Sequence, residues 1–203
     1  MTVPLRTARL SLREYEEADA PFVRDLYSRA AVQRYIGDGT QRVTTEDAAR
    51  EKIEGWRARY GEHPLHGVWL ARTWEGRPVG SLLLKPIPDS GADTAHDVEI
   101  GWHLHPDAWG RGYATEAARA VLEHAWDCGL AHVVAVTHPH NTASQAVCRR
   151  LGMTSRGLTT AYYDAECALF EITAPRARRV AVDGRGGVEG AGGVVGPGAE
   201  RKA

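Results

Sequence analysis

The stretch from Asp97 to Ala117 combines residue types that are typical of a phosphate-binding turn. Gly110 and Gly112 stand one residue apart, directly after a strand-like segment and directly before a helix-like one. Backbone N–H groups at the start of a helix lack intrahelical partners, and the helix dipole favours negative charge there. Glycines allow a sharp turn and a close approach to phosphate oxygens. The stretch therefore predicts a pyrophosphate site, although a Gly-x-Gly pair alone also marks an ordinary tight turn.

Two histidine pairs raise the alternative of a metal site. His103 and His105 are two residues apart, as are His138 and His140, and such spacing on a strand places both rings on one face. Pro139 breaks regular strand geometry in the second pair, and no carboxylate pattern completes a hydrolytic site. We therefore expect no metal ligands and keep a His-ligated metal hydrolase as the weaker alternative, which metal analysis of the purified protein would reveal.

The composition sets the broad class of protein. A chain of 203 residues with 43% hydrophobic residues is long enough for one domain with a sizeable core. The formal net charge of -1 gives no reason to expect a nucleic-acid partner or binding to an anionic membrane, and we see neither a transmembrane run nor a signal region. Three widely spaced cysteines fit a reducing compartment, so we expect a cytoplasmic protein: Cys128, Cys148 and Cys167.

The glycine turn needs a strand before it and a helix after it, and the whole chain alternates such elements. Hydrophobic periodicity and turn residues locate them. The predicted elements are a strand at 5–15, helices at 19–30 and 44–60, a hairpin of strands at 66–72 and 79–85, a strand at 98–105, a helix at 112–128, a strand at 132–137, a helix at 141–151, and strands at 154–162 and 166–173.

This order predicts an α/β (α+β) fold with a mixed, mostly antiparallel sheet of about seven strands and four helices. One strand–helix–strand crossover surrounds the glycine turn. We expect residues 1–174 to form the domain. The Gly- and Arg-rich segment 175–203 cannot bury enough apolar surface to offset its ordering entropy, so we predict a disordered tail there.

Three segments carry a resemblance to a known family. Trp109–Ala114 resembles the pyrophosphate loop of the GNAT N-acetyltransferases, Gln/Arg-x-x-Gly-x-Gly/Ala, and Asn141–Met153 is similar to their Asn-x-x-Ser-x-x-Val-x-x-Lys-x-Gly-Phe segment. Leu5–Arg13 resembles the RimJ/RimL-like branch, which includes the ribosomal-protein N-terminal acetyltransferases. Trp109 departs from the Gln or Arg of the broader family at a position that contributes mainly backbone. Cys148 stands where many relatives carry a tyrosine that protonates the leaving thiolate.

The resemblance implies a three-layer fold, acetyl-CoA as co-substrate and a pantetheine arm between two splayed central strands. The arm would pair with strand backbone at 102–105, much as another strand would. Asn141 would hydrogen-bond the arm, cap its helix, or both, while Ser144 and Arg111 also suit an ordinary helix surface and a solvated loop. The implied CoA contacts are Trp102, His103, Leu104, Trp109, Gly110, Arg111, Gly112, Tyr113, Ala114, Asn141 and Ser144.

Acetyl transfer to an amine requires a neutral nucleophile, whereas a free lysine amine has a pKa of about 10.4. A general base must therefore take a proton. Glu99, on the strand before the glycine turn, is the candidate, with an arginine-paired edge carboxylate as the alternative. The Leu104 N–H would stabilise the oxyanion. Because a thiol has a pKa of roughly 8.5, the CoA thiolate leaves without much help, and Cys148 then serves packing rather than acid catalysis.

The predicted function is therefore N-acetyl transfer from acetyl-CoA to a primary amine by direct attack in a ternary complex. The acceptor is either a protein N-terminus or a small-molecule amine, and the family leaves a homodimer open. A non-catalytic acyl-CoA sensor of the same fold is the alternative, which thiol release with a panel of amines would separate. Five aromatic residues line the acceptor pocket or belong to the core: Tyr35, Trp56, Trp69, Tyr162 and Tyr163.

Overall fold

The computed structural model describes residues 2–40, 42–91 and 97–175. Within them the strands are β1 (Leu5–Arg6), β2 (Leu10–Glu14), β3 (Gly67–Thr73), β4 (Pro78–Pro86), β5 (Val98–Leu104), β6 (His132–Thr137), β7 (Thr154–Thr159) and β8 (Cys167–Thr173). The helices there are α1 (Ala20–Ser28), α2 (Ala30–Gln33), α3 (Glu46–Tyr60), α4 (Tyr113–Asp127) and α5 (Thr142–Arg150), with 3-10 turns at Glu17–Asp19 and Pro106–Ala108.

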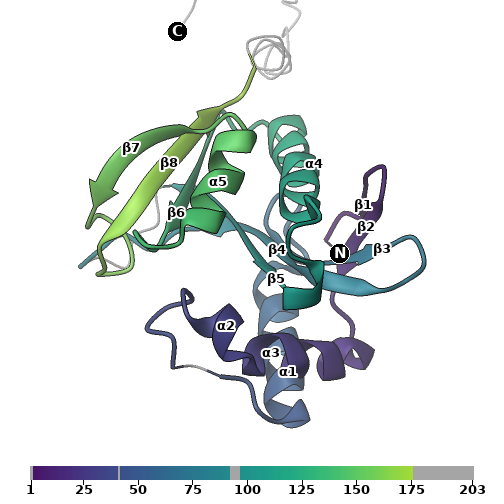
Figure 1. The fold of residues 1–203 in the computed structure, drawn as a ribbon. Coiled ribbons are helices and arrows are strands. Elements are labelled where there is room, and N and C mark those ends of the chain that lie inside the picture. The colour runs from purple at the N-terminus through teal and green to yellow at the C-terminus, as the bar shows by residue number, and fades with distance from the viewer. Residues whose placement is uncertain (1, 41, 92–96, 176–203) are drawn as a thin grey trace, which may run out of the picture.

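The described strands form one sheet in the order β1-β2-β3-β4-β5-β6-β8-β7, and every neighbouring pair is antiparallel except β5 and β6. Helices α1, α2 and α3 lie on one side of the sheet, and α4 and α5 lie on the other (Figure 1). Each side has its own apolar core, because successive strand side chains point to opposite faces. Leu70 packs toward α1 and α3, whereas its neighbour Trp69 packs toward α4.

The first predicted strand is wrong in one respect, because the structure divides it into a hairpin. The Thr7 hydroxyl accepts hydrogen bonds from the Leu10 N–H at 2.8 Å and the Arg9 N–H at 3.3 Å, and this local turn separates β1 from β2. The described chain therefore has eight strands rather than about seven. It also has five α-helices rather than four, since Arg29 is extended (φ -74°, ψ 121°) and separates α1 from the short α2.

The remaining predicted elements are confirmed within a few residues. Helix α3 begins one residue later than its capping signal suggested, with the Thr45 hydroxyl accepting from the Ala48 N–H at 3.2 Å. The tail predicted at 175–203 lies, apart from residue 175, outside the described residues, as does part of the loop before β5. No helix in the described ranges is long and apolar enough to cross a membrane.

The sheet opens at its centre, where the two parallel strands meet. One pair of residues, Glu99 and Val134, registers β5 with β6, so the splay predicted between the central strands is present. Both strands run toward the same edge of the sheet, and each is followed by a helix that starts there, α4 after β5 and α5 after β6. Ligands of open α/β sheets bind at such an edge, beyond the carboxyl ends of parallel strands.

Candidate active site

The glycine turn at the start of α4 has the geometry of an anion cradle. Gly110 and Gly112 have φ values of 71° and 77°, in the left-handed region that favours glycine, and Gly112 is the N-cap of α4. A β-carbon added at Gly110 would meet no heavy atom within 4 Å, so the turn faces open space. Arg111 between them is exposed. Tyr113 and Ala114 are the first residues of α4, and their backbone N–H groups have no partner within the helix. These N–H groups can therefore donate to phosphate oxygens.

Trp109 ties this turn to the end of β5. Its indole Nε1–H donates to the Leu104 carbonyl oxygen at 2.8 Å, while the residue as a whole remains 51% exposed. The sequence predicted that this position contributes mainly backbone, and the structure adds a role for the side chain. The bond fixes the end of the central strand relative to the predicted phosphate site.

Arg9, at the tip of the β1–β2 hairpin, contacts the same turn although it lies far from it along the sequence. Its Nη1 donates to the Arg111 carbonyl oxygen at 3.0 Å, and its Nη2 lies 2.5 Å from the Glu116 carboxylate in the first turn of α4. The guanidinium also lies 4.8 Å from the centre of the Tyr113 ring. Sequence reasoning missed this contact, because no local pattern connects residues 102 positions apart.

Glu116 receives hydrogen bonds from the Thr7 hydroxyl at 2.6 Å and from the Arg9 N–H at 2.8 Å. Burial alone would raise the pKa of this carboxyl group. The bonds from Thr7 and Arg9 outweigh burial, so the net pKa lies below the ordinary value of 4.5. The carboxylate form therefore holds the hairpin against the start of α4.

The gap between β5 and β6 leaves backbone groups available. In an antiparallel pair, successive residues alternate between bonding the partner strand and pointing away from it. Because the His105 N–H donates to the Val79 oxygen at 2.9 Å, the alternation directs the backbone groups of Trp102 and Leu104 away from β4 and toward the gap. They lie beyond the single registered pair with β6. The Leu104 carbonyl already accepts from the Trp109 indole, so the Trp102 backbone groups are the ones that fit the amides of a pantetheine arm, while the Leu104 N–H fits the predicted oxyanion site.

His103 lies differently from Trp102 and Leu104. It is registered with Ser81 of β4, so the same alternation turns its backbone toward β4, away from the gap. Its side chain lies on the α1–α3 side, where Nδ1 is 3.0 Å from the Tyr27 hydroxyl. Burial, followed by the charges of Lys52 and Lys85, lowers the pKa of His103 to about 4. The expectation that His103 contacts CoA therefore has no support from its geometry.

At the second helix of the site, Asn141 caps α5. Its side-chain oxygen accepts from the Ser144 N–H at 3.1 Å, and the amide NH₂ group is left for another partner. Ser144 is half-buried. Cys148, a residue of α5, is fully buried in the core, and burial raises its pKa to about 12. A thiol in that environment agrees with packing rather than acid catalysis.

The predicted base, Glu99, is almost fully buried, with 6% of its surface exposed. Its Oε1 lies 2.5 Å from the Lys85 ammonium and also accepts a hydrogen bond from the Tyr163 hydroxyl. Lys85 in turn lies 2.7 Å from that hydroxyl. Burial and then the negative Glu99 raise the pKa of Tyr163, so Tyr163 stays protonated. The carboxylate is thus paired with a lysine rather than with an arginine, in a compact Lys–Glu–Tyr cluster.

A pocket of about 290 Å³ lies next to this cluster, on the α1–α3 side of the sheet. Lys85 belongs to both, since it pairs with Glu99 and lines the pocket. Of the aromatic residues proposed for an acceptor pocket, Trp56 lines it, whereas Trp69 is fully buried in the core. The lining residues are Lys52, Gly55, Trp56, Arg59, Tyr60, Val68, Leu83 and Lys85.

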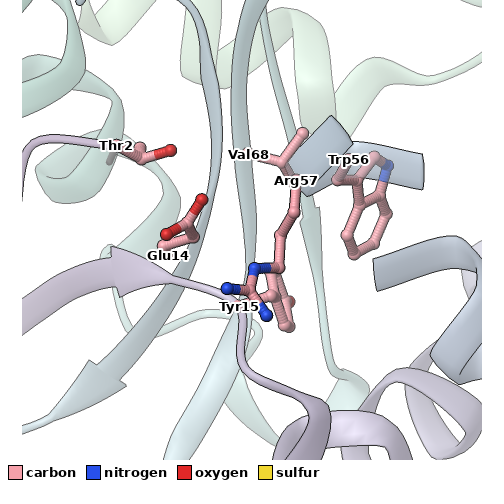
Figure 2. Close-up of a pocket in the computed structure, with 6 residues that line it drawn as sticks. All are labelled: Thr2, Glu14, Tyr15, Trp56, Arg57 and Val68. Carbon is pink, nitrogen blue, oxygen red and sulfur yellow. The ribbon is translucent and has the colours of Figure 1, made fainter. Parts of the chain in front are cut away.

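Trp56 and Val68 also border a smaller hollow nearer β2 (Figure 2). That hollow has an accessible volume of about 0 Å³, so it has no room for a ligand. Its other lining residues are Thr2, Glu14, Tyr15 and Arg57. The larger pocket is therefore the better site for a second substrate.

The histidine pairs do not form a metal centre in the described part of the chain, where no group of three or more His, Cys, Asp or Glu side chains is close enough to hold an ion. His105 Nε2 lies 3.1 Å from the Asp25 carboxylate, while His103 contacts Tyr27. Nothing in this geometry favours the metal-hydrolase alternative.

The site combines a phosphate cradle, a gap that suits a pantetheine arm, and a pocket beneath α3, with the buried Glu99 carboxylate between the gap and the pocket. This combination is typical of a CoA-dependent acyltransferase. Residues 9–154 match the family described as acetyltransferase (GNAT) domain, and the chain belongs to this family. It is accordingly an acetyl-CoA-dependent N-acetyltransferase.

The relatives agree with this assignment. The chain is 29% identical over 154 residues to the uncharacterized N-acetyltransferase YnaD of Bacillus subtilis, covering 75% of this chain and 84% of the relative. It is 32% identical over 155 residues to FsC-acetyl coenzyme A-N(2)-transacetylase of Aspergillus fumigatus, covering 74% of this chain and 64% of the relative. Mycobacterium smegmatis RimJ in complex with CoA-disulfide shares the fold, with a TM-score of 0.70, 22% identity, and 90% and 94% of the two chains covered.

Proposed function

We propose that the acceptor amine approaches from the pocket beneath α3 and attacks acetyl-CoA held in the gap between β5 and β6. The observation that carries the proposal is the position of Glu99. Glu99 is paired with Val134 at the point beyond which the gap opens, and its side chain contacts Lys85, which lines the pocket. The Glu99 carboxylate thus lies between the gap that would hold acetyl-CoA and the pocket that would hold the amine.

In this proposal the chain's own residues act at two points, and the third step needs only solvent. Glu99 accepts the proton of the attacking amine, directly or through one water. The Leu104 N–H stabilises the oxyanion as the amine nitrogen bonds to the carbonyl carbon. The carbon–sulfur bond then breaks, and the CoA thiolate leaves and takes a proton from solvent. His103 is a poorer base, because a pKa of about 4 means that it holds a proton weakly near neutral pH.

Replacing Glu99 by glutamine tests the proposal. The variant keeps the side-chain size, and we expect kcat to fall by about 10²- to 10⁴-fold, the usual contribution of a general base, with the KM for acetyl-CoA little changed. Glu54→Gln, at an exposed position on α3, is the matched control and should retain wild-type turnover. Full turnover by Glu99→Gln across the pH range would show that the base lies elsewhere.

The sensor alternative and the cellular context are open to direct experiments. Release of free CoA only when an amine is added supports an enzyme, whereas binding of acetyl-CoA without thiol release supports a sensor.

We also infer a cytoplasmic location, supported by the three free cysteines, and cell fractionation tests it. A homodimer is the oligomeric state that we propose from the family resemblance, and sedimentation of the purified protein tests it.

A further inference from the structure

The pocket beneath α3 is lined by three cationic side chains and by no carboxylate among its lining residues. Lys85 is neutralised by Glu99 at 2.5 Å. Lys52 and Arg59 are different, since neither has a carboxylate at ion-pair distance within the described ranges. Among the described residues, two positive charges without a paired carboxylate therefore border a cavity that adjoins the proposed base.

In the described part of the chain, Lys52 contacts aromatic rings and forms no ion pair. Its ammonium lies 5.0 Å from the centre of the Tyr27 ring and 5.3 Å from that of Trp56. The side chain is half-buried, and burial lowers its pKa. A partly desolvated cation forms stronger hydrogen bonds to an anionic oxygen than a fully hydrated one does. The position of Lys52 therefore favours an oxyanion as its partner.

The helical spacing explains why α3 leaves these charges unpaired. Residues at i, i+3, i+4, i+7 and i+8 share one face of a helix. Glu51 and Glu54 of α3 fall outside that series when it starts at Lys52, and both are exposed. The face that borders the pocket consists of Lys52, Gly55, Trp56, Arg59 and Tyr60.

We propose that Lys52 and Arg59 bind an oxyanion of the acceptor, so that the acceptor is a small primary amine that also carries a carboxylate or a phosphate. This inference rests on the proposed function, because it places the amine at Glu99 and the anion at the other side of the same pocket. A volume of about 290 Å³ suits a molecule the size of an amino acid.

Matched pairs of acceptors test the inference through CoA release from acetyl-CoA. Glycine is compared with glycinamide, and phosphoethanolamine with ethanolamine, which separates the carboxylate source from the phosphate source. A third pair, dipeptide amides with an acidic or a neutral second residue, tests a peptide acceptor. We expect kcat/KM to be about 10- to 100-fold higher for the anionic member of at least one small pair, as charge-assisted hydrogen bonds provide.

The variants assign that preference to the two cations. Lys52→Met and Arg59→Gln should each lower kcat/KM for the preferred anionic acceptor about 10-fold more than kcat/KM for its neutral partner, and the KM for acetyl-CoA should stay near the wild-type value. Arg59 is exposed, so its variant is expected to fold normally even if Lys52→Met does not. Arg57→Gln, on α3 but bordering the smaller hollow, is the control that should keep the preference.

A binding measurement separates failure of the inference from failure of the proposed function. Trp56 lines the pocket, so inorganic phosphate should change its fluorescence saturably in the wild type and not in Arg59→Gln or Trp56→Phe. Acetylation of neutral and anionic amines at equal rates would overturn the inference and leave the proposed function standing. A preference confined to the peptide pair would overturn the small acceptor. Saturable phosphate binding without any amine acetylation would support the anion site and refute the proposed function.

Discussion

Replacing Arg9 by alanine removes the side-chain contacts that connect the β1–β2 hairpin to the glycine turn and to the start of α4. The loss comprises a half-exposed ion pair with Glu116, worth about 0.5 kcal/mol, and a charge-assisted bond to the Arg111 carbonyl, worth about 1 kcal/mol. The cation–π contact with Tyr113 adds about 0.5 kcal/mol. The sum is about 2 kcal/mol, which lowers Tm by roughly 4–8 °C in a domain of this size.

The same loss should loosen the phosphate cradle, because Arg111 stands between its two glycines. We expect the KM for acetyl-CoA to rise several-fold while kcat changes little, since Arg9 has no contact with Glu99 or the pocket. Thermal unfolding and initial-rate kinetics measure the two effects. Arg6→Ala is the control, because Arg6 is on the same hairpin but contacts the Trp74 ring instead of the turn.

The difference between wild type and Arg9→Ala should also depend on pH. The pKa of Glu116 is lowered in the folded protein, so its stabilisation is present above the ordinary value of 4.5 and is lost as pH falls through the lowered pKa. The stability difference should therefore be largest near neutral pH and shrink below about pH 4.5. An Arg9→Ala protein with wild-type Tm and wild-type KM for acetyl-CoA would refute the reasoning.

Three further predictions concern the glycine turn and the cysteines. Gly112→Ala places a β-carbon at φ 77°, which costs about 1–2 kcal/mol, and should lower Tm and raise the KM for acetyl-CoA; an unchanged melting curve would contradict this. Trp109→Phe loses the hydrogen bond to the Leu104 oxygen while keeping an aromatic ring. It should raise the KM for acetyl-CoA several-fold in initial-rate kinetics and lower the free energy of unfolding only slightly in urea. Cys148 should resist iodoacetamide in the native protein at pH 8, since burial raises its pKa to about 12, whereas exposed Cys128 should react, as peptide mass analysis would show.

Local sequence signals predicted most of the elements. The glycine spacing at Gly110 and Gly112 placed the start of α4, and the alternation of apolar residues located β5. Such signals act over a few residues, because capping, turns and hydrophobic periodicity are local properties. The same locality explains the first strand, where the Thr7 turn depends on a side-chain bond that periodicity does not show.

The sequence by itself predicted the phosphate cradle, the candidate base and the family, because each can be recognised from short motifs within which the informative residues are close together along the chain. Only the tertiary structure decided what surrounds them. Arg9 reaches Arg111 across 102 positions, and Tyr163 from the β7–β8 loop closes over Glu99. The position of Lys52 at the pocket, likewise, became visible only once α3 was placed over β4. Burial and pairing of charges depend on contacts between distant segments, and these contacts exist only after the chain has folded.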